Sequence, residues 1–257
     1  MMMIPATFHD LRGASVFITG GGNGIGAALT EGFVEQGAQV AFVGRSDATA
    51  FCDEVAARHG ARPLFIACDV TDTAALQAAM DQAAAAHGPI RVLVVNAADD
   101  TRIPADQVTP EFWDQSQAVN LRHYFFAAQK AAAIMAPAGG GSIIMFSSIT
   151  YLLGLAGLAP YVTANAGIMG MMRGLAREWG PQNIRVNGLA PGWVLTERQR
   201  RLWATPEALA EFLPRQSLQN FMEPVDMLGA VLFMASGTSR FMTGQMMVVD
   251  AGVAGVG

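Results

Sequence analysis

A glycine-rich segment near the start of the chain has the composition of a phosphate-binding turn. Its residues, Thr19 to Gly26, read Thr-Gly-Gly-Gly-Asn-Gly-Ile-Gly. They follow a β-type run, Ser15–Thr19, and open a helical pattern, Ile25–Gln36. Glycine allows a tight turn and lets backbone N–H groups approach a phosphate, while the helix N-terminus adds partial positive charge. This order of elements predicts a pyrophosphate site, with an ordinary strand-to-helix turn as the alternative.

The remaining sequence supplies a sheet and helices to position such a turn. Short apolar runs predict strands at 15–19, 39–43, 63–68, 90–96, 142–147, 184–189 and 245–250. Helical patterns lie between them, at 25–36, 48–59, 71–87, 109–135, 158–179 and 224–236. Thr71 and Thr109 are the expected N-caps of two of these helices. The alternation predicts an α/β fold with a Rossmann-type, doubly wound parallel sheet and helices on both faces.

We expect a single dinucleotide-binding and catalytic domain over residues 1–257, because no repeat, low-complexity run or linker divides the chain. Only residues 193–223 interrupt the alternation of strands and helices. Within this segment a short helix is expected to start at Thr205 and Pro206. Connections at the carboxyl ends of parallel strands carry ligand contacts in such sheets. We therefore expect this insert to be a lid over the substrate, with an ordinary surface excursion as the alternative.

Composition excludes several classes of protein. Hydrophobic residues make up 52% of the chain and charged residues only 14%, which excludes a disordered chain. The net charge of −5 argues against a nucleic-acid partner. No apolar run has the roughly 20 residues that a membrane span needs, and no signal peptide is seen at the start. We expect a cytoplasmic protein without a membrane partner, and the low charge suggests a further buried surface between subunits.

Several spaced motifs resemble the short-chain dehydrogenase/reductase family over nearly the whole chain. Gly20, Gly24 and Gly26 have that family's glycine spacing. Asn96-Ala97-Ala98 matches a further motif, although Ala98 replaces its glycine, and Ser148 lies thirteen residues before Tyr161, as the family's serine does before its tyrosine. The remaining matches are Asn120, Pro191-Gly192 with Thr196, Thr243-Gly244-Gln245 and Val249-Asp250. Within the family, residues 99–102 and 120–123 look most similar to bacterial sugar dehydrogenases of the xylose type.

The resemblance implies an oxidoreductase that interconverts a secondary alcohol or sugar hydroxyl and its carbonyl with NAD(P). It assigns catalytic roles to Tyr161, Ser148 and Asn120, and places Asn165 in the catalytic group. The implied cofactor-binding residues are Gly20, Asn23, Gly24, Ile25, Gly26, Arg45, Asp69, Val70, Asn96, Pro191, Gly192, Val194 and Thr196.

Asn165 is the main departure from the family pattern. The family has a lysine four residues after the tyrosine, on the same helix face, where its cation lowers the tyrosine pKa and its ammonium holds the nicotinamide ribose. Asparagine can hydrogen-bond a ribose hydroxyl but carries no charge to stabilise a phenolate. We therefore expect impaired activity, or activity that rises toward alkaline pH.

The second predicted strand suggests which dinucleotide is bound. An acidic residue at its end would accept bonds from an adenosine 2′-hydroxyl, but Gly44, Arg45 and Ser46 follow Val43 instead. The planar fork of Arg45 suits a 2′-phosphate. We expect NADP, with NAD as the alternative.

The expected partners are a small alcohol or sugar substrate and further copies of the chain, in a homotetramer. Asp99, Asp100 and Arg102 are candidates for binding sugar hydroxyls. We interpret a small basic cluster in the insert as a solvated face, with contact to an acidic substrate as the alternative; its residues are Arg198, Arg200 and Arg201. We interpret His123 as a packed or interface residue. No metal is expected. A non-catalytic dinucleotide-binding protein and a non-redox enzyme on the same fold stay open as alternatives.

Overall fold

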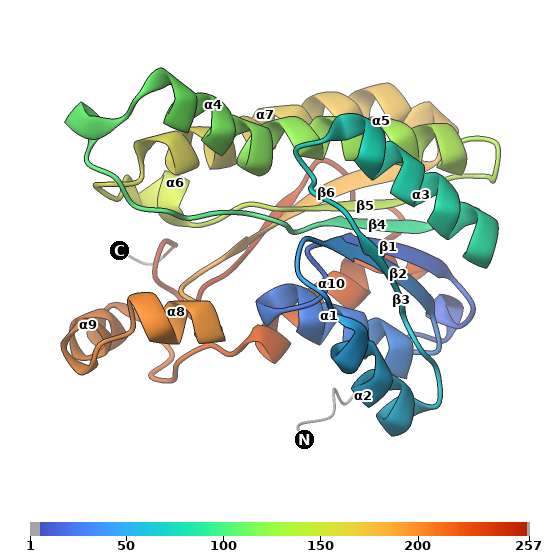
Figure 1. The fold of residues 1–257 in the computed structure, drawn as a ribbon, viewed down its shortest axis with the longest axis horizontal. Coiled ribbons are helices and arrows are strands. Elements are labelled where there is room, and N and C mark those ends of the chain that lie inside the picture. Colours follow the sequence, from blue (N-terminus) through green and yellow to red (C-terminus); the bar gives the residue numbers. More distant parts are fainter. Residues whose placement is uncertain (1–5, 256–257) are drawn as a thin grey trace.

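In the computed structural model, which describes residues 6–255, the chain forms one parallel sheet covered by helices on both faces (Figure 1). The strand order is β3-β2-β1-β4-β5-β6-β7, and every neighbouring pair is parallel. The strands are β1 (Ser15–Thr19), β2 (Gln39–Gly44), β3 (Leu64–Ala67), β4 (Val92–Val95), β5 (Gly141–Phe146), β6 (Ile184–Pro191) and β7 (Met246–Val249). The predicted doubly wound α/β sheet is confirmed.

The helices divide the apolar core into two layers. α3 (Thr73–His87), α5 (His123–Met135) and α7 (Ala159–Trp179) pack on one face, and α1 (Gly24–Glu35), α2 (Thr49–His59) and α10 (Leu228–Ala235) on the other. β4 reads Val-Leu-Val-Val, and all four residues are buried. Its side chains enter both layers, which explains why its sequence shows no polar alternation. None of the described helices is long and apolar enough to cross a membrane.

The predicted helix over residues 109–135 is divided in the structure. α4 (Pro110–Gln117) begins at the expected N-cap, where Thr109 Oγ1 accepts a bond from the Phe112 amide at 3.2 Å. A π-helical turn (Ala118–Arg122) then separates α4 from α5. Such a turn holds one extra residue, a widening that the spacing of apolar positions does not show. This turn carries Asn120.

Two other boundaries differ from the predictions. The N-cap of α3 is Asp72, whose carboxylate accepts a bond from the Ala75 amide at 3.0 Å. Thr71 is not the cap, because its hydroxyl donates to Asp69 instead. The helix predicted over 224–236 begins as a 3₁₀ turn (Pro224–Met227) and becomes α-helical only in α10.

The sequence order of the strands reverses between β1 and β4, so the loops after these two strands lead in opposite directions. Residues 193–223 extend beyond the carboxyl ends of the sheet and contain α8 (Glu197–Leu202) and α9 (Pro206–Phe212). Figure 1 shows these helices apart from both helical layers, while the short α6 (Thr150–Leu153) lies near α4. The base of the insert is closed by a bridge between Val194 and Met222.

Candidate active site

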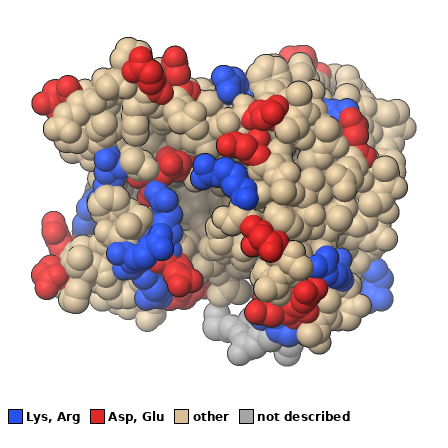
Figure 2. All heavy atoms as spheres, in the orientation of Figure 1, with Lys and Arg blue, Asp and Glu red and all other residues tan. Residues whose placement is uncertain are grey.

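A cavity of about 1170 Å³ lies at the carboxyl ends of the strands. Figure 2 shows the molecule hollowed on this side, with Lys and Arg side chains at the rim. The loops after β1, β2, β3, β4, β5 and β6 line the cavity together with the 193–223 insert. All the site residues named from the sequence line it except Gly26, which lies behind the glycine-rich turn.

The glycine-rich turn has room for backbone but little for side chains. Gly20 and Gly24 have φ angles of +72° and +52°, which favour glycine. A Cβ on Gly26 would overlap the Gly20 carbonyl oxygen. The side chain of Asn23 makes no cap bond to α1, so the first N–H groups of that helix are not capped by it. A backbone cradle at a helix N-terminus suits a pyrophosphate, so these residues fit the dinucleotide that the motif implies.

Asn96, at the end of β4, holds this turn in place. Its Nδ2 lies 3.3 Å from the Thr19 carbonyl oxygen and 3.2 Å from that of Gly20. The Thr19 hydroxyl accepts the backbone amides of Asn96 and Ala97 at 3.0 and 3.1 Å. Asn96 therefore ties the end of β4 to the glycine-rich turn after β1, and it lies at the point between these two strands where the strand order reverses.

The far end of the cavity carries the residues suited to an adenosine. Arg45 is exposed there after β2, and the neighbouring Asp47 accepts bonds from the backbone and hydroxyl of Thr49. Asp69, after β3, accepts the amide and hydroxyl of Thr71 at 2.9 and 2.8 Å. These bonds, chiefly the backbone one, lower the pKa of Asp69, and the charge of Arg45 contributes. Val70 is buried beside it.

The segment after β6 brings the insert against the glycine-rich turn. Gly192 donates to the Val249 carbonyl at 2.9 Å, and a Cβ on Gly192 would lie 2.8 Å from the Asp250 Cα. Thr196 caps α8 by accepting the Gln199 amide at 3.2 Å. Its methyl group faces Gly24, where an added Cβ would lie 3.1 Å away. Pro191 through Thr196 thus form a wall of the dinucleotide end of the cavity.

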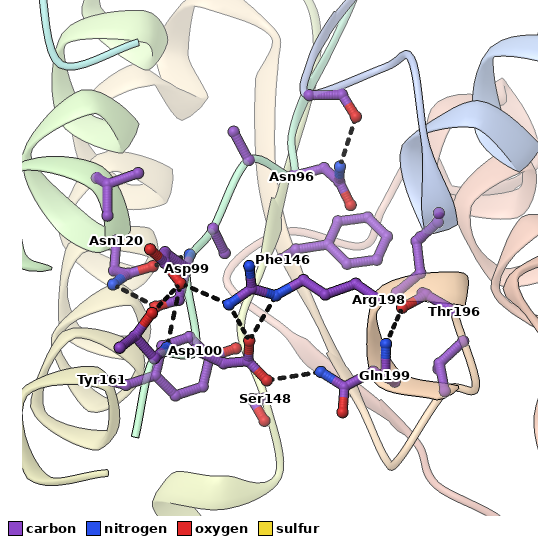
Figure 3. Close-up of a pocket in the computed structure, with 18 of the residues that line it drawn as sticks. Asn96, Asp99, Asp100, Asn120, Phe146, Ser148, Tyr161, Thr196, Arg198 and Gln199 are labelled. Atoms are coloured by element: carbon purple, nitrogen blue, oxygen red, sulfur yellow. Dashed lines mark hydrogen bonds and ion pairs between the residues drawn. The ribbon is translucent and has the colours of Figure 1, made fainter. Parts of the chain in front are cut away.

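Tyr161, Ser148 and Asn165 line the cavity, and Figure 3 shows Tyr161 and Ser148 close together beside Asp100. Tyr161 lies in the first turn of α7, and Ser148 follows β5. Desolvation, followed by the charge of Asp100, raises the pKa of the phenol to about 12, although the neighbouring polar side chains of Asn165 and Ser148 act to lower it. A phenol with this pKa is protonated at neutral pH.

Asn120 ties the loop after β4 to the π-helical turn. Its Oδ1 accepts the Asp99 amide at 2.8 Å, and its Nδ2 donates to the Asp99 carbonyl at 3.0 Å and to Ser116 Oγ at 3.2 Å. The carboxamide is almost fully buried. Asn120 therefore fixes the backbone from which the Asp99 and Asp100 side chains enter the cavity.

Comparison with known proteins identifies the family. A family model described as "Enoyl-(Acyl carrier protein) reductase" matches residues 20–254. A "Probable galactose dehydrogenase GalD" of Rhizobium meliloti is 49% identical over 98% of this chain and 100% of the relative. The chain belongs to the short-chain dehydrogenase/reductase family. A D-xylose 1-dehydrogenase of Caulobacter vibrioides is 42% identical over 97% of this chain and 99% of the relative.

A solved structure shares the fold of this short-chain dehydrogenase/reductase. A blue fluorescent protein from a metagenomic library, in complex with NADPH, superposes with a TM-score of 0.87 at 34% identity, covering 95% of this chain and 99% of that one. This protein is accordingly an oxidoreductase of a family that binds a nicotinamide dinucleotide.

Asn165 differs from the family's lysine in what its side chain contacts as well as in charge. Its Nδ2 donates to the Tyr161 carbonyl oxygen at 2.8 Å, one helical turn earlier, and its own carbonyl accepts the Ser147 hydroxyl at 3.1 Å. The first bond lies within α7, and the second, accepted by the backbone carbonyl of Asn165, ties α7 to the residue that follows β5. In this dehydrogenase/reductase the residue at the lysine position stabilises the backbone around Tyr161.

The insert supplies cavity residues that the sequence did not single out. Trp193, Gln199, Trp203 and Phe212 all line the cavity. Their only signal in the sequence was their place in the segment that interrupts the alternation. Arg198 is exposed, in agreement with its interpretation as part of a solvated face, but its guanidinium also binds Asp99 and Asp100, which line the cavity.

Two other side chains agree with their plain interpretations. Arg200 pairs with Glu223 at the surface. His123 is buried, and desolvation lowers its pKa to about 3, so it is neutral near pH 7. Among residues 6–255, no group of three or more His, Cys, Asp or Glu side chains could hold a metal ion.

Proposed function

We propose that this protein oxidises a hydroxyl group of an alcohol or sugar to a carbonyl, and catalyses the reverse reduction, with a nicotinamide dinucleotide. The observation that carries the proposal is that Tyr161 and Ser148 lie near each other in the cavity that begins at the glycine-rich turn (Figure 3). The relatives named for galactose and D-xylose support an aldose as the substrate.

Each central residue has a defined task in this proposal. Tyr161 Oη removes the hydroxyl proton during oxidation and returns it during reduction. Ser148 Oγ hydrogen-bonds the substrate oxygen, and Asn120 holds the loop that carries Asp99 and Asp100. The bound dinucleotide supplies hydride acceptance and donation. The 193–223 insert serves as the lid that excludes water from the reacting atoms.

Asn165 makes the proposed enzyme weak in oxidation near neutral pH. An uncharged amide leaves the desolvated phenol without a cation to stabilise its ionised form. The base form of Tyr161 then rises with pH over the whole range in which the protein can be assayed. We propose an alkaline-shifted oxidoreductase, and the retained Tyr161–Ser148 pair favours it over a non-catalytic dinucleotide-binding protein.

For the cofactor we propose NADP. Arg45 is the charged residue placed at the end of β2, while Asp47 binds Thr49. A similar structure binds NADPH, which supports the same choice. The residues proposed to hold the dinucleotide are those of the glycine-rich turn, Arg45, Asp69, Val70, Asn96 and the wall from Pro191 to Thr196.

The proposed assembly is a homotetramer located in the cytoplasm. Helices α4, α5 and α7 lie along one side of the molecule (Figure 1), where Trp113 and Phe125 are about two-fifths exposed. Ala166, Gly170 and Gly174 are also exposed on α7, at intervals of four residues. Small side chains on one helix face allow close approach of a second helix, so we propose this face as one subunit contact.

The test is turnover of an alcohol and aldose panel, including D-galactose and D-xylose, followed through nicotinamide absorbance at pH 7 and pH 10. Tyr161→Phe should lower turnover by about 10²–10⁴-fold, the usual contribution of a general base. Tyr151→Phe is the matched control, because Tyr151 does not line the cavity. Full activity of the Tyr161 variant, binding without turnover, or product without a net change in the cofactor would each contradict the proposal.

A further inference from the structure

The chain holds a single lysine, Lys130, and it lies outside the cavity. Its Nζ is 2.6 Å from Asp81 Oδ1, in a pair between α5 and α3. No lysine elsewhere in the sequence replaces the one missing at position 165. Any side-chain cation that offsets charge near Tyr161 near neutral pH must therefore be an arginine or a protonated histidine.

Arg198 is the arginine that lines the cavity and pairs with the carboxylates near Tyr161, with its side chain still 46% exposed. Its Nη2 lies 2.9 Å from Asp99 Oδ1 and 3.3 Å from Asp100 Oδ1. Gln199, the next residue of α8, donates from Nε2 to Asp100 Oδ2 at 2.6 Å. Figure 3 shows Arg198 and Gln199 reaching from α8 to Asp99 and Asp100, which lie next to Tyr161 and Ser148. Two residues of the insert thus bind the loop after β4.

The charged and titratable groups around Tyr161 leave its surroundings negative. Asp99 and Asp100, from the loop after β4, both raise the pKa of the phenol. The buried Tyr124 of α5 interacts with it as a further phenol. Ser148 and Asn165 are uncharged. Two carboxylates and one guanidinium give a local charge of −1, and without Arg198 that charge would be −2.

Arg102 and the other insert arginines that line the cavity, Arg201 and Arg215, form no ion pair with these carboxylates. The guanidinium of Arg102 stacks over the Trp203 ring at 4.1 Å. Arg198 therefore has the geometry to control the charge that faces the phenol.

The same contact couples the insert to the fixed part of the site. Asp99 binds Asn120 through its backbone and Arg198 through its side chain. Trp193 Nε1 donates to Gln199 Oε1 at 2.9 Å, which orients the amide that holds Asp100. Opening of the insert would separate Arg198 and Gln199 from both carboxylates and leave those charges beside Tyr161.

We propose that Arg198 is the charge-balancing positioning residue of this active site, supplied by the insert where the family uses a lysine from α7. By pairing with Asp99 and Asp100 it favours the ionised form of Tyr161 when the insert is closed, and closure thereby activates the base. This inference rests on the proposed role of Tyr161. It assigns Arg198 no contact with the reacting atoms.

The first experiment compares oxidation by Arg198→Gln, Arg198→Lys and Asp100→Asn in the native sequence at fixed pH between 8 and 10. We expect Arg198→Gln to lower kcat and Asp100→Asn to raise it, by up to about tenfold for each unit of pKa change. Arg198→Lys should keep most of the activity, because it keeps the charge. Arg200→Gln is the matched control on the same helix, because Arg200 pairs only with Glu223.

The second experiment measures ionisation without turnover. Tyrosinate absorbance is titrated in the Asn165→Lys background, where the added cation brings the Tyr161 pKa into an accessible range, and Tyr161→Phe identifies its signal. Arg198→Gln should shift that signal to higher pH and Asp100→Asn to lower pH, and Arg198→Lys should leave it in place.

Titrations that do not differ among these variants would overturn the charge-balancing role of Arg198. An effect of Arg198→Gln on the KM for the sugar alone would also overturn it, because it would identify Arg198 as a substrate ligand. Failure of the proposed function is seen separately, as full activity of Tyr161→Phe.

Discussion

At the scale of single residues, the residue one helical turn after Tyr161 on α7 carries an uncharged amide. Asn165 occupies the position from which a lysine would face Tyr161, but its amide bonds to the helix backbone. The phenol keeps its desolvated environment and two nearby carboxylates, and its pKa rises to about 12. In the proposed mechanism oxidation needs the phenolate and reduction needs the phenol, so pH should act on the two directions differently.

The native protein should therefore show opposite pH behaviour in its two reactions. Between pH 7 and 10, all below the Tyr161 pKa, the phenolate fraction rises tenfold per unit, so kcat/KM for oxidation should rise with a slope near one. The phenol fraction stays close to unity, so kcat/KM for reduction should stay level. Initial rates in both directions across this range test the expectation. A plateau in oxidation below pH 9 would contradict it.

Asn165→Lys should give the profile of a site with a lowered tyrosine pKa. The ammonium favours the phenolate, so oxidation at pH 7 should rise by up to about tenfold for each unit of pKa lowering. Oxidation should then level off, and reduction should fall, above the new pKa. Asn165→Ala is the control, since it removes the backbone bond without adding charge. Identical profiles for the lysine and alanine variants would show that charge at this position is unimportant.

Arg45 should determine the preference for NADP. Charge-assisted hydrogen bonds contribute about 1.5–3 kcal/mol each, so Arg45→Ala should weaken NADPH binding by about 10–100-fold and change NADH binding little. Fluorescence titration of both reduced cofactors measures this directly. Arg58→Ala serves as control, because Arg58 pairs with Glu31 outside the cavity. Equal losses for both cofactors would show that Arg45 does not read the 2′-phosphate.

At the scale of elements, the site depends on close approach of backbone segments. α1 begins directly under the glycine-rich turn, and the position of Gly26 leaves no space for a side chain against the Gly20 carbonyl. Asn96 bonds to the same carbonyl from β4. The geometry of the turn is thus fixed by contacts between β1, β4 and α1.

Gly26→Ala should disturb both stability and cofactor binding. The added methyl must displace the Gly20 carbonyl or the Asn96 amide, and overpacking of this kind costs about 1–3 kcal/mol. Cofactor affinity should fall by about tenfold or more, because the backbone N–H groups move from the phosphate position. Urea unfolding and cofactor titration measure the two effects. Gly229→Ala on α10, where nothing lies within 4 Å of an added Cβ, should have neither effect.

At the scale of the whole molecule, the sequence predicted the layers of the fold better than the contacts across its cavity. The seven strands and their alternation with helices follow from local apolar runs, as β4 illustrates. The π-helical turn at Asn120 was not predicted, since one extra residue changes no local preference. The pairing of Arg198 with Asp99 joins residues 99 positions apart, and no periodicity encodes such a contact.

The small-residue face of α7 also required the structure. Ala164, Gly167 and Ala176 make this helix smooth, but Ala164 and Ala176 are buried and Gly167 faces Leu121. Gly170 is exposed, with nothing within 4 Å of an added Cβ, in line with the exposed Ala166 and Gly174. A face that is smooth, exposed and flanked by the partly exposed Phe125 is suited to a second copy of the chain.

Gly170→Glu should therefore reduce the assembly without unfolding the subunit. A carboxylate in a helix-to-helix contact would be buried without a partner and would repel its symmetry mate, which destabilises an interface strongly. The particle mass measured by light scattering should fall to a smaller oligomer, while circular dichroism stays unchanged. Ala57→Glu adds the same charge to an exposed site on α2, on the opposite side of the sheet, and should keep the parent mass. A parent protein that is monomeric, or a Gly170 variant with the parent mass, would remove α7 as a subunit contact.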